Sequence, residues 1–260
     1  MNIFKGNILF RYFLLVLPFA FIFSKDNNLI SGIEYYKNRA ENSSGIVAKS
    51  DPIVKAIQKF DLAKTESELE ASIYLLRCYY YKGKYVSKTD DDKKTVFNQG
   101  KSLAEEMIKK YPQSAAMRYW YLVNLGSWSE VYGILAAARE GVADLMKTHS
   151  EKIIEIDKNY GDGGGYFMLG AVHFKSPYIP FILSWPDNDE AIINLRLAYQ
   201  TGDQTPTQTV YLARALYKDG QNDEAIEMLN KLILQPLSKD ELVEDTEQHT
   251  IAKGLLADWE

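Results

Sequence analysis

Cysteine and histidine are scarce in this chain. Its 260 residues include one cysteine, Cys78, and three histidines, His149, His173 and His249, which lie far apart. A single thiol cannot form an internal disulfide, so we expect Cys78 to be a buried residue of a helix. No H-x-x-x-H or C-x-x-C spacing suits a metal ion, and the chain has neither a P-loop nor a G-x-S-x-G elbow. The sequence therefore predicts a non-enzymatic protein without a metal or cofactor.

Two further patterns are missing. No segment alternates apolar and polar residues with a period of two, so we expect essentially no β-sheet. Basic clusters are also absent: 30 Lys and Arg stand against 35 Asp and Glu, which gives a formal net charge of −5. That balance opposes general binding to nucleic acid, and none is expected as a partner.

The apolar run near the N-terminus is short for a membrane span. Lys5 and Arg11 precede an apolar stretch over residues 12–23, and the small residue Ser24 follows it. Spanning a bilayer takes about 20 apolar residues, whereas a basic start, a dozen apolar residues and a small residue form the layout of a secretory signal. We therefore predict a cleaved signal peptide over residues 1–24, or an uncleaved anchor that would be the chain's one membrane contact.

A helical hairpin is clearest in residues 207–236. Its first helix carries Leu212, Ala213 and Leu216, and its second carries Ala225, Leu229 and Leu232, with Gly220 between the helices and Pro236 at the end. This spacing resembles the tetratricopeptide repeat, a helix–turn–helix unit of about 34 residues. One such hairpin cannot bury both of its faces, so hairpins of this kind stack on one another.

Two fainter copies of this pattern lie upstream, each interrupted by an insertion. Repeat-like units are predicted near residues 68–112, 163–202 and 206–238, with insertions at residues 86–97 and 175–189. The expected fold is all-α: a tetratricopeptide-like array of helical hairpins, or α-solenoid, that forms a single domain over residues 25–260 and has irregular insertions between helices.

Capping patterns predict where several helices begin. Asp51-Pro52, Thr65–Glu68, Thr89–Asp92 and Ser238–Glu241 each have the residue types of a helix start. In the middle of the chain, separate helices are expected over about 114–126, 129–140 and 140–158. The glycine-rich stretch 161–165 is expected to form a loop before the next helix, either a tight turn that permits close packing or an anion-binding turn.

The candidate binding residues come from two unusual stretches and the repeat register. Aromatic residues crowd residues 116–133 and could form core or line a pocket, with Asn124 or Arg139 as a polar contact. The proline-rich, apolar insertion could cover core, line a ligand cavity or present a surface to a partner. The predicted residues for ligand or partner binding are Tyr119, Trp120, Asn124, Trp128, Tyr166, His173, Tyr178, Trp185 and Arg214.

Residues 100–236 show a narrower resemblance. The segments NLGSWSEVYG, KIIEIDKNYGDGGGYFMLGAVHFKSPYIPF and SWPDNDEAIINLRLAY resemble secreted bacterial tetratricopeptide proteins related to the T component of TRAP transporters. The resemblance implies a periplasmic, all-helical protein that associates with a substrate-binding protein and surrounds a cleft for an apolar ligand. The lipoprotein cysteine that is frequent in that group is missing here.

Three functional hypotheses follow. The first is an exported binding or adaptor module, in the periplasm or tethered to the inner membrane by its N-terminus. It would serve TRAP-type solute uptake with a small apolar or carboxylate ligand. The second is a structural scaffold for envelope protein complexes. The third is an enzyme with an unrecognised site near His173 and the glycine stretch.

Overall fold

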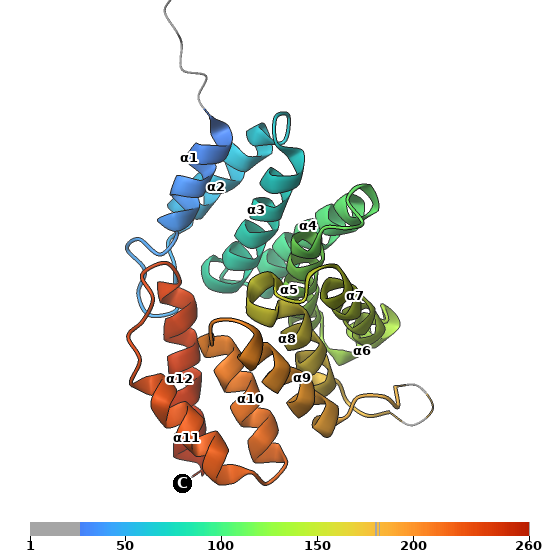
Figure 1. Ribbon diagram of the computed structural model, residues 1–260. Helices are drawn as coiled ribbons and strands as arrows, with labels where there is room; N and C mark the ends of the chain where they lie inside the picture. Colours follow the sequence, from blue (N-terminus) through green and yellow to red (C-terminus); the bar gives the residue numbers. More distant parts are fainter. Residues whose placement is uncertain (1–26, 180, 182, 260) are drawn as a thin grey trace, which may run out of the picture.

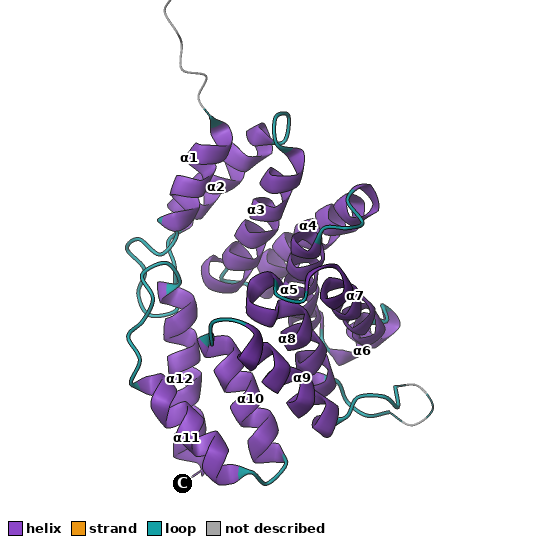
Figure 2. Ribbon diagram, in the orientation of Figure 1, coloured by secondary structure: helices purple, strands orange, loops and turns teal. Residues whose placement is uncertain are grey.

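The computed structural model describes residues 27–179, 181 and 183–259, and the predicted signal or anchor over residues 1–24 lies outside them. The described residues contain twelve α-helices, one short π-helix and no strand (Figures 1 and 2). The elements are α1 Asn28–Lys37, α2 Ser50–Ala63, α3 Glu68–Tyr81, η1 Lys82–Val86, α4 Asp90–Lys110, α5 Ala115–Tyr132, α6 Ile134–Arg139, α7 Val142–Asp157, α8 Tyr160–Lys175, α9 Asn188–Thr201, α10 Pro206–Lys218, α11 Asn222–Ile233 and α12 Leu242–Trp259. The all-α expectation is confirmed. None of the helices among these residues is long and apolar enough to cross a membrane.

The helices form a curved double layer of antiparallel hairpins. Successive helices pack on each other through the pairs α1–α2, α3–α4, α5–α7, α8–α9 and α10–α11, and α12 packs on α11. The first helices of the hairpins also contact one another in the order α1, α3, α5, α8, α10 and α12. Helices on the concave side of a curved array come closest together, so we call these six the inner layer. The predicted solenoid is confirmed.

Small residues allow the paired helices to approach closely. In the α10–α11 hairpin, Leu216, Ala225 and Leu229 are completely buried. At Gly170 on α8, an added Cβ would lie 2.7 Å from Cγ of Leu195 on α9. The repeat register read from the sequence therefore identifies the helix crossings correctly. Burying these apolar faces supplies most of the stabilisation, at about 25 cal/mol per Å² of apolar surface.

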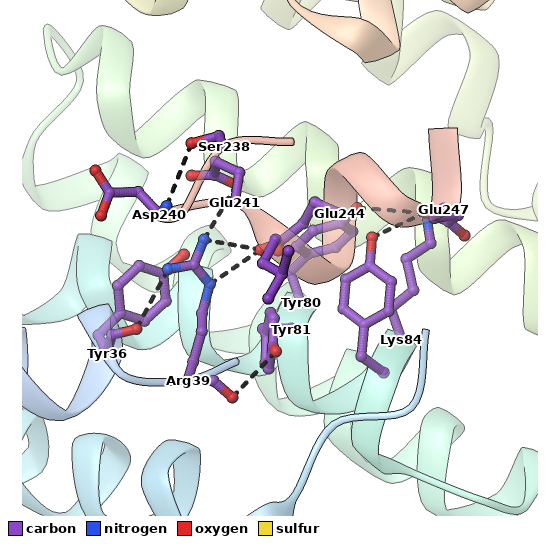
Figure 3. A network of polar contacts seen from close by, with 12 residues as sticks. Tyr36, Arg39, Tyr80, Tyr81, Lys84, Ser238, Asp240, Glu241, Glu244 and Glu247 are labelled. Carbon is purple, nitrogen blue, oxygen red and sulfur yellow. Dashed lines mark hydrogen bonds and ion pairs between the residues drawn. The ribbon is translucent and has the colours of Figure 1, made fainter. Parts of the chain in front are cut away.

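The two ends of the array meet. Arg39, in the turn after α1, is 2% exposed and its Nη2 lies 2.9 Å from a carboxylate oxygen of Glu244 on α12 (Figure 3). On the other side of the same contact, Glu247 of α12 accepts hydrogen bonds from Tyr85 at 2.8 Å and Lys84 at 2.7 Å. Val243 of α12 is buried in the hydrophobic cluster of the N-terminal helices. The array is therefore closed by contacts of α12 with the turn after α1 and with η1.

Two predicted capping boxes are wrong. The hydroxyl of Thr65 donates to the carbonyl of Leu62, so it remains bound to the turn that ends α2 and caps nothing in α3. Near the C-terminus, the Ser238 N–H donates to the Asp245 carboxylate and α12 begins only at Leu242. The prediction at Thr89 is confirmed, because its side chain accepts from the N–H of Asp92 at 3.1 Å.

Two other predicted boundaries need correction. Helix α2 begins one residue before Asp51, which lies in its first turn instead of capping it. Helix α5 runs without the predicted break between residues 126 and 129. Ser127 and Ser129 donate their hydroxyl protons to carbonyls of their own helix. The helix ends at Gly133, whose φ is +85°.

The glycine-rich stretch makes a tight, closely packed turn. Gly161, Asp162 and Gly163 have positive φ angles, and regular helix follows them. A Cβ added at Gly164 would lie 2.6 Å from the ring of Tyr119, and one at Gly163 would lie 2.9 Å from Cα of Ala198. The close-packing interpretation is thus what the structure shows. Cys78 is completely buried on α3 as expected, and burial raises the pKa of its thiol.

Candidate binding face

A cluster of half-buried aromatic residues lies beside one cation on the inner layer. We call it the Arg77 face and define it as Arg77 and Tyr80 of α3, Tyr119 and Trp120 of α5, and Tyr160 of α8. The ring centres of Tyr80 and Trp120 lie 6.2 Å apart, and those of Tyr119 and Tyr160 lie 5.6 Å apart. Three inner helices therefore contribute to one partly exposed aromatic surface.

Arg77 has aromatic neighbours but no polar partner. Its guanidinium carbon lies 5.1 Å from the ring centre of Trp120, 5.1 Å from that of Tyr36 and 5.2 Å from that of Tyr74. No described residue offers it a hydrogen bond or an ion pair, and its Nε is buried without an acceptor. Cation–π contacts stabilise a guanidinium, but they leave its N–H groups without acceptors.

The nearby acids are already bound to other cations. Glu244 and Glu241 pair with Arg39, and Glu247 pairs with Lys84 (Figure 3). Burial raises the pKa of Glu244 to about 7, despite the opposing effect of Arg39 and with the help of the like charge on Glu241. Burial alone would lower the pKa of Lys84, but Tyr80 and Glu247 hold it above its ordinary value.

The inner layer continues toward α10 with more aromatic residues and another cation. The ring of Phe174 on α8 lies 5.2 Å from the guanidinium carbon of Arg214, and Tyr211 packs on Phe174 and Phe167. Like Arg77, the Arg214 side chain has no carboxylate within ion-pair distance among the described residues. The predicted residue Arg214 therefore lies on an inner helix, beside aromatic rings rather than in a solvated ion pair.

Asn124 and Trp128 lie in a different place from Trp120. The Asn124 side chain is completely buried and donates to the carbonyls of Leu76 and Trp120, at 3.0 and 2.9 Å. The indole of Trp128 donates to Asn98 of α4 at 2.8 Å. Both side chains join helices within the core, so the structure does not bring all the predicted residues of this stretch into one pocket.

The insertion after α8 has a packed base and an exposed tip. At the base, His173 accepts from the N–H of Asp187 and its ring meets that of Trp185 at 4.9 Å. The Trp185 indole donates to Asp144 of α7 at 2.9 Å. At the tip, Tyr178 is 63% exposed, and this segment stands away from the helices (Figure 1).

These contacts show where the remaining predicted binding residues lie. Burial lowers the pKa of His173, as expected for a packed ring that accepts a hydrogen bond. The alternative that the insertion covers the core applies at its base, where Trp185 packs against the main core. It does not apply at the tip, where Tyr178 is exposed. Tyr166 is a partly buried residue packed against the main core. The insertion thus brings His173 and Trp185 together, and places Tyr178 away from the Arg77 face.

None of the predicted residues lines the recess of about 400 Å³ between α9 and α11, which includes Arg196, Tyr199, Glu224 and Met228. Conversely, the sequence interpretation missed Arg77, Tyr80 and Tyr160. The first two lie at i and i+3 on the first helix of a repeat, and the register argument applied to Arg214 would have found them. Among the described residues, no cluster of three or more His, Cys, Asp or Glu side chains could hold a metal ion.

A known protein family matches much of this chain. The family model for regulator of microtubule dynamics protein 1-3 matches residues 42–181, more than half of the chain. The chain belongs to this family. The matched segment contains the whole Arg77 face but ends before α12.

Curated relatives match over shorter parts of their length. Regulator of microtubule dynamics protein 3 of Rattus norvegicus is 27% identical over 161 residues, which are 56% of this chain and 32% of that protein. The protein of the same name from Mus musculus is 34% identical over 85 residues, covering 33% of this chain and 17% of that protein. The chain therefore spans about a third or less of the length of these relatives.

A solved structure supports the fold. A thermophilic TPR protein of Thermus thermophilus aligns with a TM-score of 0.58 over 90% of this chain and 97% of that one, at 15% sequence identity. At that identity the likeness shows the fold alone, and the fold is a tetratricopeptide-like array. None of these matches supports the resemblance to the T component of TRAP transporters.

Proposed function

We propose that this protein is a non-enzymatic binding module that holds a segment of a partner protein on the inner layer of its helical array. The observation that carries the proposal is the Arg77 face. Half-buried aromatic rings and an unpaired guanidinium lie on neighbouring inner helices, within the segment that matches the family. Aromatic residues and arginine are the residue types enriched where protein interfaces bind most strongly.

The names of the relatives suggest a class of partner. The rat and mouse relatives are called regulators of microtubule dynamics. We therefore extend the proposal to tubulin polymers or proteins bound to them as the partners of this module. Since the chain spans about a third or less of those relatives, this extension needs its own test.

The binding proposal is tested by affinity capture with matched variants. The wild-type chain, Trp120→Ala and Trp259→Ala are immobilised, and the proteins retained from cells of the source organism are identified by mass spectrometry. Trp259 is a suitable control because it stacks on Tyr217 at 3.9 Å, away from the Arg77 face. Wild type and Trp259→Ala should retain proteins that Trp120→Ala, folded by circular dichroism, loses. Identical sets for all three would contradict the proposal.

Co-sedimentation with purified microtubules tests the narrower extension. The wild-type chain should pellet with the polymer, and Trp120→Ala should remain in the supernatant. If both proteins stay in the supernatant while the affinity capture succeeds, the module binds proteins but not microtubules.

A second candidate function is a carrier for a small apolar or carboxylate ligand, the role proposed with TRAP-type uptake and a periplasmic substrate-binding protein. The aromatic residues beside Arg77 would suit such a ligand. Native mass spectrometry of the protein from its own cells decides between the two candidates. A stoichiometric small molecule supports the carrier, and a bound protein alone supports the binding module or a scaffold.

Export to the periplasm is a separate proposal, because it rests on residues 1–24. N-terminal sequencing of the protein from its own cells tests it. A chain that begins near Lys25 supports a cleaved signal, and a chain that retains residues 1–24 contradicts cleavage.

A further inference from the structure

The Arg77 guanidinium has no carboxylate partner among the described residues. Its Nε is shut off from solvent and has no acceptor, and no described residue binds its terminal nitrogens. Native proteins pair nearly all their buried polar groups, because an unpaired donor loses its hydrogen bonds to water without replacement. A half-buried guanidinium with free donors is therefore the feature on this face that most requires a ligand.

The charges around Arg77 favour an anionic ligand. Glu241, whose charge raises the pKa of Arg77, pairs with Arg39 in the end-to-end contact. Glu247 is likewise occupied by Lys84 and Tyr85. The Arg77 face therefore has uncompensated positive charge in a chain whose formal net charge is −5. A guanidinium forms two parallel hydrogen bonds with a carboxylate, which matches its planar fork better than any neutral group does.

The aromatic rings beside Arg77 add an apolar contact surface to the cationic group. Trp120 lies next to the guanidinium, and Tyr80 packs on Trp120. Tyr119 and Tyr160 extend the aromatic surface from Trp120 to α8. These rings offer apolar contact area next to the charge. An acidic residue with an apolar or aromatic neighbour in a peptide would satisfy both parts at once.

We propose that the Arg77 face binds a carboxylate of a partner's peptide segment, with Arg77 as the residue that contacts the carboxylate and Trp120 as the surface for the adjacent apolar residue. This inference rests on the proposed function and adds to it the chemistry of the partner. The carboxylate is that of an acidic side chain inside the segment, because the aromatic surface continues beyond Arg77 and gives the neighbouring residues of the segment a place to pack.

The test uses pools of twelve-residue peptides, acetylated and amidated at their ends and free of other acids. One pool has Glu at a fixed central position next to Phe, and a second has Gln there. A third has Gln with a free C-terminal carboxylate. Binding to the full-length chain is measured by fluorescence anisotropy for wild type, Arg77→Gln, Arg77→Lys and Lys88→Gln. Lys88 is an exposed cation outside the Arg77 face and serves as the matched control.

Wild type and Lys88→Gln should bind the Glu pool more tightly than the amidated Gln pool, by about 10- to 100-fold. Arg77→Gln should remove that preference, and Arg77→Lys should retain part of it because the charge remains. The Gln pool with a free C-terminal carboxylate should bind less tightly than the Glu pool, and the reverse order would contradict the assignment to a side chain. Added salt should weaken binding of the preferred pool to wild type more than binding of the amidated Gln pool.

Two other results would overturn the inference in distinguishable ways. If all pools bind wild type equally, or if folded Arg77→Lys and Arg77→Gln both keep the full preference, the carboxylate assignment is wrong while peptide binding stands. If no pool binds wild type, peptide binding on this face fails together with the inference.

Discussion

Helix α5 carries two tryptophans with closely similar cation contacts and opposite surroundings. Trp120 lies 5.1 Å from the guanidinium carbon of Arg77, and Trp128 lies 5.0 Å from Nζ of Lys101. Lys101 also binds Glu140 at 2.7 Å, and the Trp128 indole has Asn98 as its acceptor. Among the described residues Arg77 has no carboxylate within ion-pair distance, and Trp120 is only half buried. We call the arrangement around Trp128 and Lys101 the α4–α5 junction, after the helices that it joins.

The difference shows that the type of contact does not identify a binding site. Each tryptophan has a cation at its face, but only the α4–α5 junction satisfies its polar groups from within the protein. A site is marked by polar groups that the fold leaves unsatisfied and by aromatic surface that it leaves exposed. On this criterion we propose the Arg77 face as the binding site, whereas the α4–α5 junction is part of the core.

The largest expected effect comes from truncating the two tryptophans. Trp128→Ala should lower the free energy of unfolding by about 3–5 kcal/mol, because Trp128 is 6% exposed and its removal leaves a cavity. Trp120→Ala should cost less than about 2 kcal/mol, since part of that ring already faces solvent. Urea unfolding followed by circular dichroism measures both. Equal losses of unfolding free energy for the two variants would contradict the distinction between the Arg77 face and the α4–α5 junction.

A smaller effect is expected from pH, through Glu244, the buried acid that pairs with Arg39. Burial raises the pKa of Glu244 from 4.5 to about 7 in the folded protein, so the folded state binds this proton more tightly than the unfolded chain does. The resulting stabilisation is complete below pH 4.5 and is lost as pH rises through 7. The groups that face or influence Glu244 are Arg39, Glu241, Tyr80 and Tyr81.

We therefore expect the stability of wild type to include a component that falls between pH 4.5 and pH 7, on the order of 3 kcal/mol. Unfolding of wild type and Glu244→Gln across this range measures it, and the difference between the two proteins isolates the contribution of Glu244. A difference that does not change with pH would show that Glu244 is ionised throughout and paired with Arg39 as an ordinary salt bridge.

The smallest expected effect concerns the polar partner at the α4–α5 junction. Asn98→Ala should cost about 1 kcal/mol because the Trp128 indole loses its acceptor. Asn98→Asp keeps an acceptor oxygen and serves as the control, with a smaller loss. Thermal unfolding separates the two variants. If Asn98→Ala is as stable as wild type, water replaces Asn98 as the acceptor of the Trp128 indole N–H, and the junction is open to solvent.

The sequence predicts the repeated parts of this molecule better than the parts that occur once. Gly170 and Ala225 were recognisable as helix-crossing residues because small residues recur there at helical spacing, and the structure confirms them. Asn124 and Trp128 were grouped with Trp120 because all are close in sequence. A helix, however, turns side chains only a few residues apart toward different neighbours.

The contact between Arg39 and Glu244 could not be predicted, because it joins residues 205 positions apart and nothing local in the sequence marks it. The pairing of Glu241 with Arg39 likewise joins residues far apart in the sequence, so the charges around the inner layer could not be assigned from the sequence.

Solute quenching of tryptophan fluorescence tests the central claim most directly. Two variants are compared, each with Phe at three of the four tryptophans, so that only Trp120 or only Trp128 remains. If the Arg77 face is open and positively charged, iodide should quench Trp120 much more strongly than caesium does, and Arg77→Gln should remove that difference. Trp128 should resist both ions. If Trp120 resists iodide as well as Trp128 does, the face is closed and the account of it as a binding surface is wrong.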